Sequence, residues 1–149
     1  MLFGKRNRVV KRILIVEDEP LTAFDNEMTL ADLGYEVVAT LDSFSNAIAL
    51  LGREQIDLVL TDVRLSGERT GVDLAKAAKE KGIPVLFSTG MKLPEHARPF
   101  ALGCLSKPYN ERQLRDALDR VDRLLAGESV KPTKGLELYG GDGSGGDAR

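Results

Sequence analysis

Five short apolar runs recur along the chain, and most are continuous rather than alternating with polar residues. They occupy residues 13–16, 37–40, 56–61 and 83–88, with a weaker run at 104–106. Continuous runs of this length are typical of strands buried on both faces of a sheet. Amphipathic segments separate the runs, and this alternation favours parallel strands joined by right-handed helical crossovers. We therefore expect a doubly wound α/β domain with five parallel strands and helices on both faces.

Helix boundaries are predicted from residues that cap helices. One helix is expected to begin at Pro20, since proline suits the first position of a helix. Two more are expected over residues 44–51 and 71–81. A last helix begins at Asn110, where Gln113 completes a capping box.

Two further features of the helices follow from the spacing of apolar residues and prolines. The apolar residues of the first helix are interpreted as its core-facing side: Leu21, Phe24, Met28 and Ala31. Between the fourth and fifth strands, Pro94 and Pro99 fall inside the window that a fourth helix would occupy. An interior proline costs a helix about 3 kcal/mol, so this connection is predicted to be short and irregular.

Length and composition fit one soluble domain with its own core. Of the 149 residues, 42% are hydrophobic and 30% charged, and a formal net charge of -2 does not favour nucleic-acid binding. No apolar stretch is long enough to span a membrane, and the single Cys104 cannot form an internal disulfide, so we expect a cytoplasmic protein. Residues 8–126 are predicted to form the domain, residues 1–7 a basic arm, and residues 127–149 a disordered glycine-rich tail.

Charged and hydroxyl side chains stand at the ends of four predicted strands. Glu17 and Asp18 follow the first strand, Asp62 follows the third, Thr89 follows the fourth, and Lys107 follows the fifth. Ligands of an open doubly wound sheet bind outside the carboxyl ends of its strands. If the first and third strands are neighbours, their carboxylates repel one another unless a proton or a cation lies between them. Acids without histidine or cysteine disfavour zinc and suit a hard cation, above all Mg²⁺.

A cation beside a carboxylate, a hydroxyl and an ammonium group is suited to phosphoryl transfer. The cation and Lys107 would neutralise the phosphoryl oxygens while an aspartate oxygen attacks in line. Thr89 would donate a hydrogen bond to the attached phosphoryl group.

Four segments carry a resemblance to a known family. ILIVEDEP, LVLTDVRL, PVLFSTG and LSKPY, in that order, resemble the receiver domain of two-component response regulators over about residues 12–125. The resemblance implies a flavodoxin-like sheet with strand order 2-1-3-4-5 and a sensor histidine kinase as phosphoryl donor. It implies that Asp62 is the phosphoacceptor, that Thr89 and Lys107 contact the phosphoryl group, and that the Lys107–Pro108 bond is cis.

The resemblance also implies how a Mg²⁺ ion is held. Asp18 and Asp62 would bind the ion directly, together with the backbone carbonyl of Arg64, and Glu17 would act through water.

A narrower resemblance rests on the stretch FSTGM. It is similar to the signature of the FAT GUY receivers, which have a reduced fourth helix and pair with HWE or related histidine kinases. Met91 stands where that signature has an aromatic residue, and Cys104 stands where receivers usually carry the aromatic that rotates on activation. We therefore expect rearrangement of residues 91–103 to carry the output.

Three functions from different classes are weighed. The first is a stand-alone phosphorylation switch that acts through protein contacts, as a phosphate sink or by feedback on its kinase. The second is a phosphohydrolase of the haloacid-dehalogenase kind, but Arg64 stands where such enzymes need a second aspartate. The third is an interaction module without phosphorylation, which the full set of acids, hydroxyl and lysine disfavours.

Overall fold

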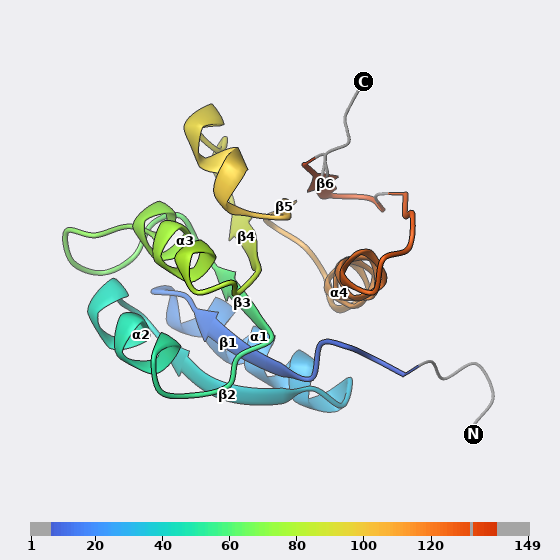
Figure 1. The fold of residues 1–149 in the computed structure, drawn as a ribbon, viewed down its shortest axis with the longest axis horizontal. Coiled ribbons are helices and arrows are strands. Elements are labelled where there is room, and N and C mark those ends of the chain that lie inside the picture. Colours follow the sequence, from blue (N-terminus) through green and yellow to red (C-terminus); the bar gives the residue numbers. More distant parts are fainter. Residues whose placement is uncertain (1–6, 132, 140–149) are drawn as a thin grey trace.

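Six strands form a single sheet at the centre of the molecule (Figure 1). The structure is a computed structural model and describes residues 7–131 and 133–139. The strand order is β2-β1-β3-β4-β5-β6, and the first five strands are parallel. Their bounds are β1 Arg12–Val16, β2 Glu36–Leu41, β3 Leu58–Thr61, β4 Val85–Thr89 and β5 Gly103–Ser106. This is the flavodoxin-like order predicted from the sequence, with one strand added.

The helices cover both faces of the sheet and bury two separate apolar clusters. Four α-helices and one 3₁₀ helix lie within the described residues: α1 Pro20–Asp32, α2 Phe44–Leu51, α3 Gly71–Glu80, η1 Glu95–Phe100 and α4 Glu111–Leu125. One cluster joins the sheet to α2, α3 and η1, and the other joins it to α1 and α4. The predicted capping box of Asn110 and Gln113 is present at the start of α4.

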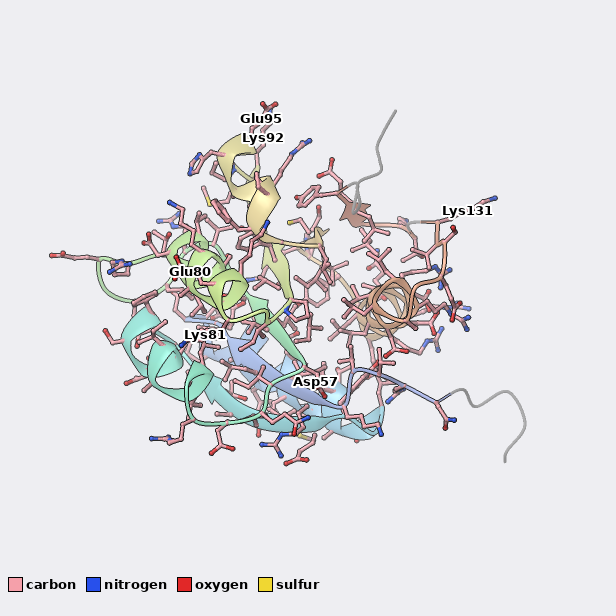
Figure 2. The ribbon with its side chains drawn as sticks, in the orientation of Figure 1. Asp57, Glu80, Lys81, Lys92, Glu95 and Lys131 are labelled. Atoms are coloured by element: carbon pink, nitrogen blue, oxygen red, sulfur yellow. The ribbon has the colours of Figure 1, made fainter. Side chains whose placement is uncertain are left out.

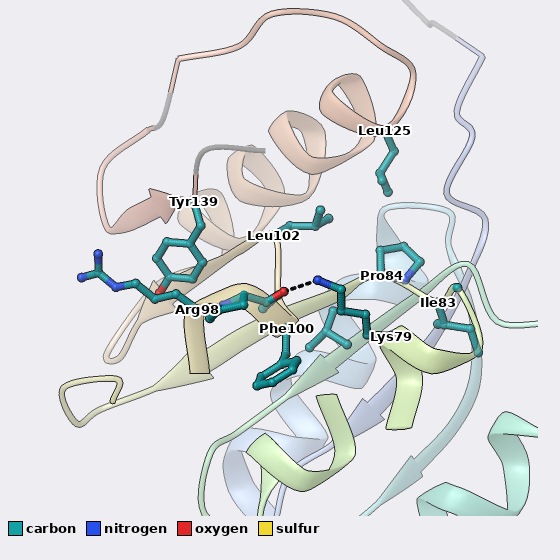
Figure 3. A pocket seen from close by; sticks show the side chains of 12 residues that line it. Lys79, Ile83, Pro84, Arg98, Phe100, Leu102, Leu125 and Tyr139 are labelled. Carbon is teal, nitrogen blue, oxygen red and sulfur yellow. Dashed lines mark hydrogen bonds between the residues drawn. The ribbon is translucent and has the colours of Figure 1, made fainter. Parts of the chain in front are cut away.

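The connection between β4 and β5 is short, as its two prolines predicted. It contains only the six-residue η1, with Pro99 inside it. Beside η1, a cavity of about 650 Å³ opens toward α3 and the end of α4 (Figure 3). Lys79 borders this cavity and donates a hydrogen bond to the carbonyl of Pro99 at 2.6 Å. The cavity meets β4 at Val85, the end of the strand opposite Thr89.

The prediction of five strands is wrong, because β6 (Leu136–Leu138) pairs antiparallel with β5. This strand lies inside the stretch 127–149, so the prediction of disorder is also wrong for these three residues. Two features outweigh the glycine-rich composition: Leu136 is buried in the α1 and α4 cluster, and Gly103 has no side chain to hold the strands apart. A Cβ atom at Gly103 would overlap the carbonyl of Glu137. Most of the predicted basic arm (1–6) and residues 140–149 of the tail lie outside the described residues.

The predicted core-facing side of α1 is also wrong. Leu21, Phe24 and Met28 are 73%, 59% and 48% exposed, and Ala31 is exposed as well. The helix instead buries Asn26, Thr29 and Leu30. Apolar spacing predicted the other side of the helix because Asn26 is polar. Asn26 is nevertheless buried, and its side chain accepts a hydrogen bond from Tyr109.

Candidate functional site

Two acids meet where neighbouring strands end. Parallel pairing places Val16 of β1 opposite Thr61 of β3, so the residues that follow, Glu17 and Asp62, reach the same edge of the sheet. Carboxylate oxygens of Glu17, Asp18 and Asp62 lie within 4.8 Å of one another. The sequence-based expectation that these carboxylates lie close together is confirmed.

Lys107 brings an ammonium group between two of these carboxylates. Its Nζ donates to Oε1 of Glu17 at 2.7 Å and to Oδ2 of Asp62 at 2.8 Å. Its backbone N–H donates to the carbonyl of Thr89 at 2.9 Å, which ties the loop after β5 to the end of β4. The Lys107–Pro108 bond is cis. We call Glu17, Asp18, Asp62 and Lys107 together the acidic site.

Burial and charge oppose each other at the acidic site. Glu17 is only 3% exposed, and desolvation raises the pKa of its carboxyl above the usual value despite the hydrogen bond from Lys107. Burial by itself lowers the pKa of Lys107, but its hydrogen bonds to Asp62 and Glu17 outweigh burial and raise that pKa. With all its carboxyls ionised, the site holds three negative charges against one positive charge. Such an excess of negative charge favours a cation.

The backbone around Asp62 is fixed by several contacts. Oδ1 of Asp62 accepts hydrogen bonds from the N–H groups of Val63 at 2.6 Å and Arg64 at 3.4 Å. The hydroxyl of Thr61 donates to the backbone carbonyl of Asp62 at 2.8 Å. A Cβ atom at Gly71, where α3 begins, would overlap that carbonyl, so the close approach needs glycine. Sequence analysis used Gly71 only as a helix boundary and missed this role.

The other predicted site residues are nearby but make different contacts. Thr89 is buried at the end of β4, and its hydroxyl accepts a hydrogen bond from the N–H of Met91 at 3.3 Å. Within residues 7–131 and 133–139, no hydrogen bond links the side-chain hydroxyl of Thr89 to the acidic site, although its backbone carbonyl accepts the N–H of Lys107. The side chain of Arg64 is exposed.

The donor set suits one class of metal ion. Three carboxylates without an imidazole or a thiolate favour a hard cation such as Mg²⁺ over zinc. Glu17, Asp18 and Asp62 are the residues that offer ligand atoms to it.

Three polar residues beside the acidic site were missed by sequence analysis. The hydroxyl of Tyr109 donates to Oδ1 of Asn26 at 2.9 Å and lies 3.2 Å from Oγ of Ser88. A cavity of about 480 Å³ is lined by Asn26, Lys107 and Tyr109, among others. The available signal was Ser88, the serine directly before Thr89 in β4. We call Asn26, Ser88 and Tyr109 the hydroxyl relay.

Acids at the amino ends of the strands have a different role. Asp57 directly precedes β3 (Figure 2). Its carboxylate accepts hydrogen bonds from the N–H groups of Lys11 and Arg12, both at 2.9 Å. These bonds attach the chain before β1 to the start of β3. Asp57 is thus satisfied by backbone donors, whereas the acids of the acidic site gather around a lysine.

Comparison with known proteins gives one consistent family. The model of the response regulator receiver domain matches residues 13–119. The chain is 34% identical over 116 residues to the transcriptional regulatory protein PdtaR of Mycobacterium tuberculosis, covering 74% of the chain and 56% of PdtaR. It is 28% identical over 118 residues to the chemotaxis protein CheY of Pseudomonas aeruginosa, covering 74% of the chain and 94% of CheY. The chain spans only about half the length of PdtaR.

A solved structure has the same fold. The signal receiver domain of a modulated diguanylate cyclase from Desulfovibrio desulfuricans superimposes with a TM-score of 0.72 and 27% sequence identity. The match covers 80% of this chain and 99% of that domain.

None of the helices within the described residues is long and apolar enough to cross a bilayer.

Proposed function

Because the chain belongs to the response regulator receiver domain family, we propose that it is a phosphorylation switch of two-component signalling and that Asp62 is its phosphoacceptor. One observation carries this proposal: Lys107 bridges Asp62 and Glu17 at the strand edge where Asp18 also lies. A carboxylate oxygen of Asp62 attacks the phosphorus of the donor, an O–P bond forms, and the bond to the donor histidine breaks. Lys107 neutralises charge on the phosphoryl oxygens during this transfer.

Mg²⁺ is the proposed cofactor of the transfer. Asp18, Asp62 and the backbone carbonyl of Arg64 would hold it, with Glu17 acting through water. The bound ion supplies positive charge that offsets the repulsion between the carboxylates and the incoming phosphoryl group. Receiver domains as a family are phosphoacceptors rather than independent enzymes, and we propose the same for this chain.

Thr89 is proposed to couple phosphorylation to the output segment. Its hydroxyl now accepts a bond from Met91, at the start of residues 91–103. Once Asp62 carries a phosphoryl group, the hydroxyl donates to it, and the population of conformers in this segment shifts. Leu93 and Ala97 anchor the segment in the core, so a shift at its start reaches η1.

A sensor histidine kinase of the HWE or a related type is the proposed donor, in the cytoplasm. The support for the kinase type is the FSTGM stretch alone. The exposed stripe of Leu21, Phe24 and Met28 on α1, which follows the acidic residues directly, offers the kinase an apolar surface. Downstream output through a protein partner, as a phosphate sink or by feedback remains part of the proposal.

Labelling by a small phosphate donor tests the assignment of Asp62. Acetyl phosphate with Mg²⁺ should add one phosphoryl mass to the wild type and none to Asp62→Ala, as measured by intact-protein mass spectrometry. Asp116→Ala is the matched control, because this α4 acid pairs with Arg115 and should leave labelling intact. Continuous turnover of p-nitrophenyl phosphate would instead indicate a phosphohydrolase. Absence of label from small donors and from all candidate kinases would indicate an interaction module.

A further inference from the structure

The hydroxyl of Tyr109 lies where three segments around the acidic site meet. It donates to Asn26 of α1, the helix that begins three residues after Glu17. It lies 3.2 Å from Oγ of Ser88, the residue before Thr89 on β4. Tyr109 itself follows Lys107 by two residues. Each member of the hydroxyl relay is therefore attached to a segment that also carries or adjoins a residue of the proposed phosphorylation chemistry.

Two members of the hydroxyl relay are buried, Tyr109 is half-buried, and its one hydroxyl serves both hydrogen bonds. Ser88 is 1% exposed and Asn26 is 3% exposed. Since Tyr109 donates its proton to Asn26, Ser88 is the donor in the second bond. Burial raises the pKa of the Tyr109 phenol, so the proton that makes the first bond stays in place at neutral pH. Loss of this one hydroxyl leaves two buried polar groups without that partner.

Lys107 is anchored by its own bonds to Thr89, Glu17 and Asp62, but the residues that follow it in the loop have few side-chain anchors. Pro108 is exposed, and Asn110 uses its side chain to cap α4. Tyr109 is thus the residue after Lys107 in this loop whose side chain reaches both α1 and β4. Its bond to Asn26 also satisfies one of the two polar residues that α1 buries.

We propose that Tyr109 is a positioning residue for phosphoryl transfer, whose hydroxyl holds the loop of Lys107 against the end of β4 and against α1. This inference rests on the proposed function, because it concerns the geometry in which Lys107 and Thr89 meet the phosphoryl group. A hydroxyl that only stabilised the core would change the midpoint of unfolding but leave the rate constant of the folded protein unchanged. A positioning role changes that rate constant, since small misplacements of reacting groups are costly.

The test measures labelling by acetyl phosphate with Mg²⁺ at several donor concentrations, well below the unfolding midpoint of every variant. The variants are Tyr109→Phe, Ser88→Ala and their double mutant. Tyr139→Phe is the matched control, because the buried hydroxyl of Tyr139 has no hydrogen-bond partner within the described residues. Thermal unfolding of each variant is recorded in parallel.

Tyr109→Phe should lower the maximal rate constant roughly tenfold and leave the half-saturating donor concentration within about twofold of the wild type. Ser88→Ala should also lower the rate constant, and the double mutant should be no slower than Tyr109→Phe, because coupled residues are not additive. Tyr139→Phe should label at the wild-type rate.

Three results would overturn the inference. One is a wild-type rate constant in Tyr109→Phe, and another is a double mutant whose loss is the product of the two single losses. If Tyr109→Phe does not fold, a wild-type rate constant in Ser88→Ala is decisive against the relay. A wild type that takes no label at all contradicts the proposed function itself, and the inference then falls with it.

Discussion

Glu17 is a buried acid whose burial opposes its charge. Desolvation raises the pKa of its carboxyl above the ordinary 4.5. Between that value and the raised one, the folded state binds more protons than the unfolded state, so stability falls as pH rises through this window. The ionised carboxylate of Glu17 therefore lowers the stability of the fold. Its presence fits a role in binding a cation better than a role in stabilising the fold.

Glu17→Gln removes this cost because the amide has nearly the shape of the carboxyl and carries no charge. Near pH 7 the variant should gain about 1 kcal/mol in free energy of unfolding, a typical gain for relief of a functional strain. The gain should shrink as pH falls toward 4.5, where the wild-type carboxyl takes up its proton. Urea unfolding at a series of pH values measures the difference.

Glu19→Gln is the control with the opposite sign. Glu19 is exposed, and hydrogen bonds from Thr22 lower the pKa of its carboxyl. Its contribution is present above the unfolded pKa and is lost as pH falls through the folded one, so this variant should lose stability at neutral pH. A Glu17→Gln variant that is less stable than wild type at every pH would show that the bond to Lys107 outweighs desolvation.

Site residues that stand at strand ends could be predicted from the sequence, whereas Ser88, Asn26 and Tyr109 of the hydroxyl relay could not. Glu17, Asp18, Asp62 and Lys107 stand at strand ends, and parallel pairing alone brings strand ends to one edge. Ser88 and Asn26 gain meaning only from the hydroxyl of Tyr109, which is 83 residues from Asn26 along the chain. A hydrogen bond between residues that far apart in the chain leaves no local sequence pattern from which it could be predicted.

At the scale of elements, α1 shows why apolar spacing can mislead. Leu21, Phe24 and Met28 recur at helical spacing and yet point to solvent. Apolar spacing depends only on the positions of apolar side chains. It cannot show that the buried side chain of Asn26 has a hydrogen-bond donor in Tyr109. For β6, the signal was equally indirect: a three-residue strand in glycine-rich sequence forms because Gly103 admits a close backbone. Strands β1 to β5 were predictable because short, continuous apolar runs are typical of strands that are buried on both faces of a sheet.

The exposed stripe of α1 predicts a difference between two phosphoryl donors. Phe24→Ser should slow transfer from the cognate histidine kinase about tenfold, since buried aromatic anchors dominate protein interfaces. Labelling by acetyl phosphate should not change, because this small donor needs no docking surface. Purified kinases of the source organism are compared by the rate of label transfer, and the fastest one is used.

Val9→Ser controls for loss of an exposed apolar side chain in general. Val9 is 49% exposed and lies before β1, at the amino ends of the strands, where its N–H bonds to Asp122. It should leave both rates unchanged. Equal rates of kinase transfer to wild type and Phe24→Ser would exclude the α1 stripe from the kinase interface.

At the scale of the whole molecule, the acidic site lies at one edge of the sheet, where residues from three strand ends come together. The two apolar clusters lie on opposite faces of the sheet, and the ends of β1, β3 and β5 reach the same edge of it. A cation bound there contacts residues that are far apart in sequence. Its affinity for the unfolded chain is therefore negligible, and its binding is linked to global stability.

Mg²⁺ should therefore raise the unfolding midpoint of the entire domain. An ion at a hundredfold excess over its dissociation constant adds about 2.7 kcal/mol, which corresponds to roughly 5–15 °C for a domain of this size. Asp18→Asn removes a charged ligand without disturbing the core, because Asp18 is exposed, and it should show a much smaller shift. Chelation with EDTA should return the wild type to its starting midpoint. Calorimetric scans at matched ionic strength separate this effect from screening, and a shift of equal size in wild type and Asp18→Asn would place the bound ion away from the acidic site.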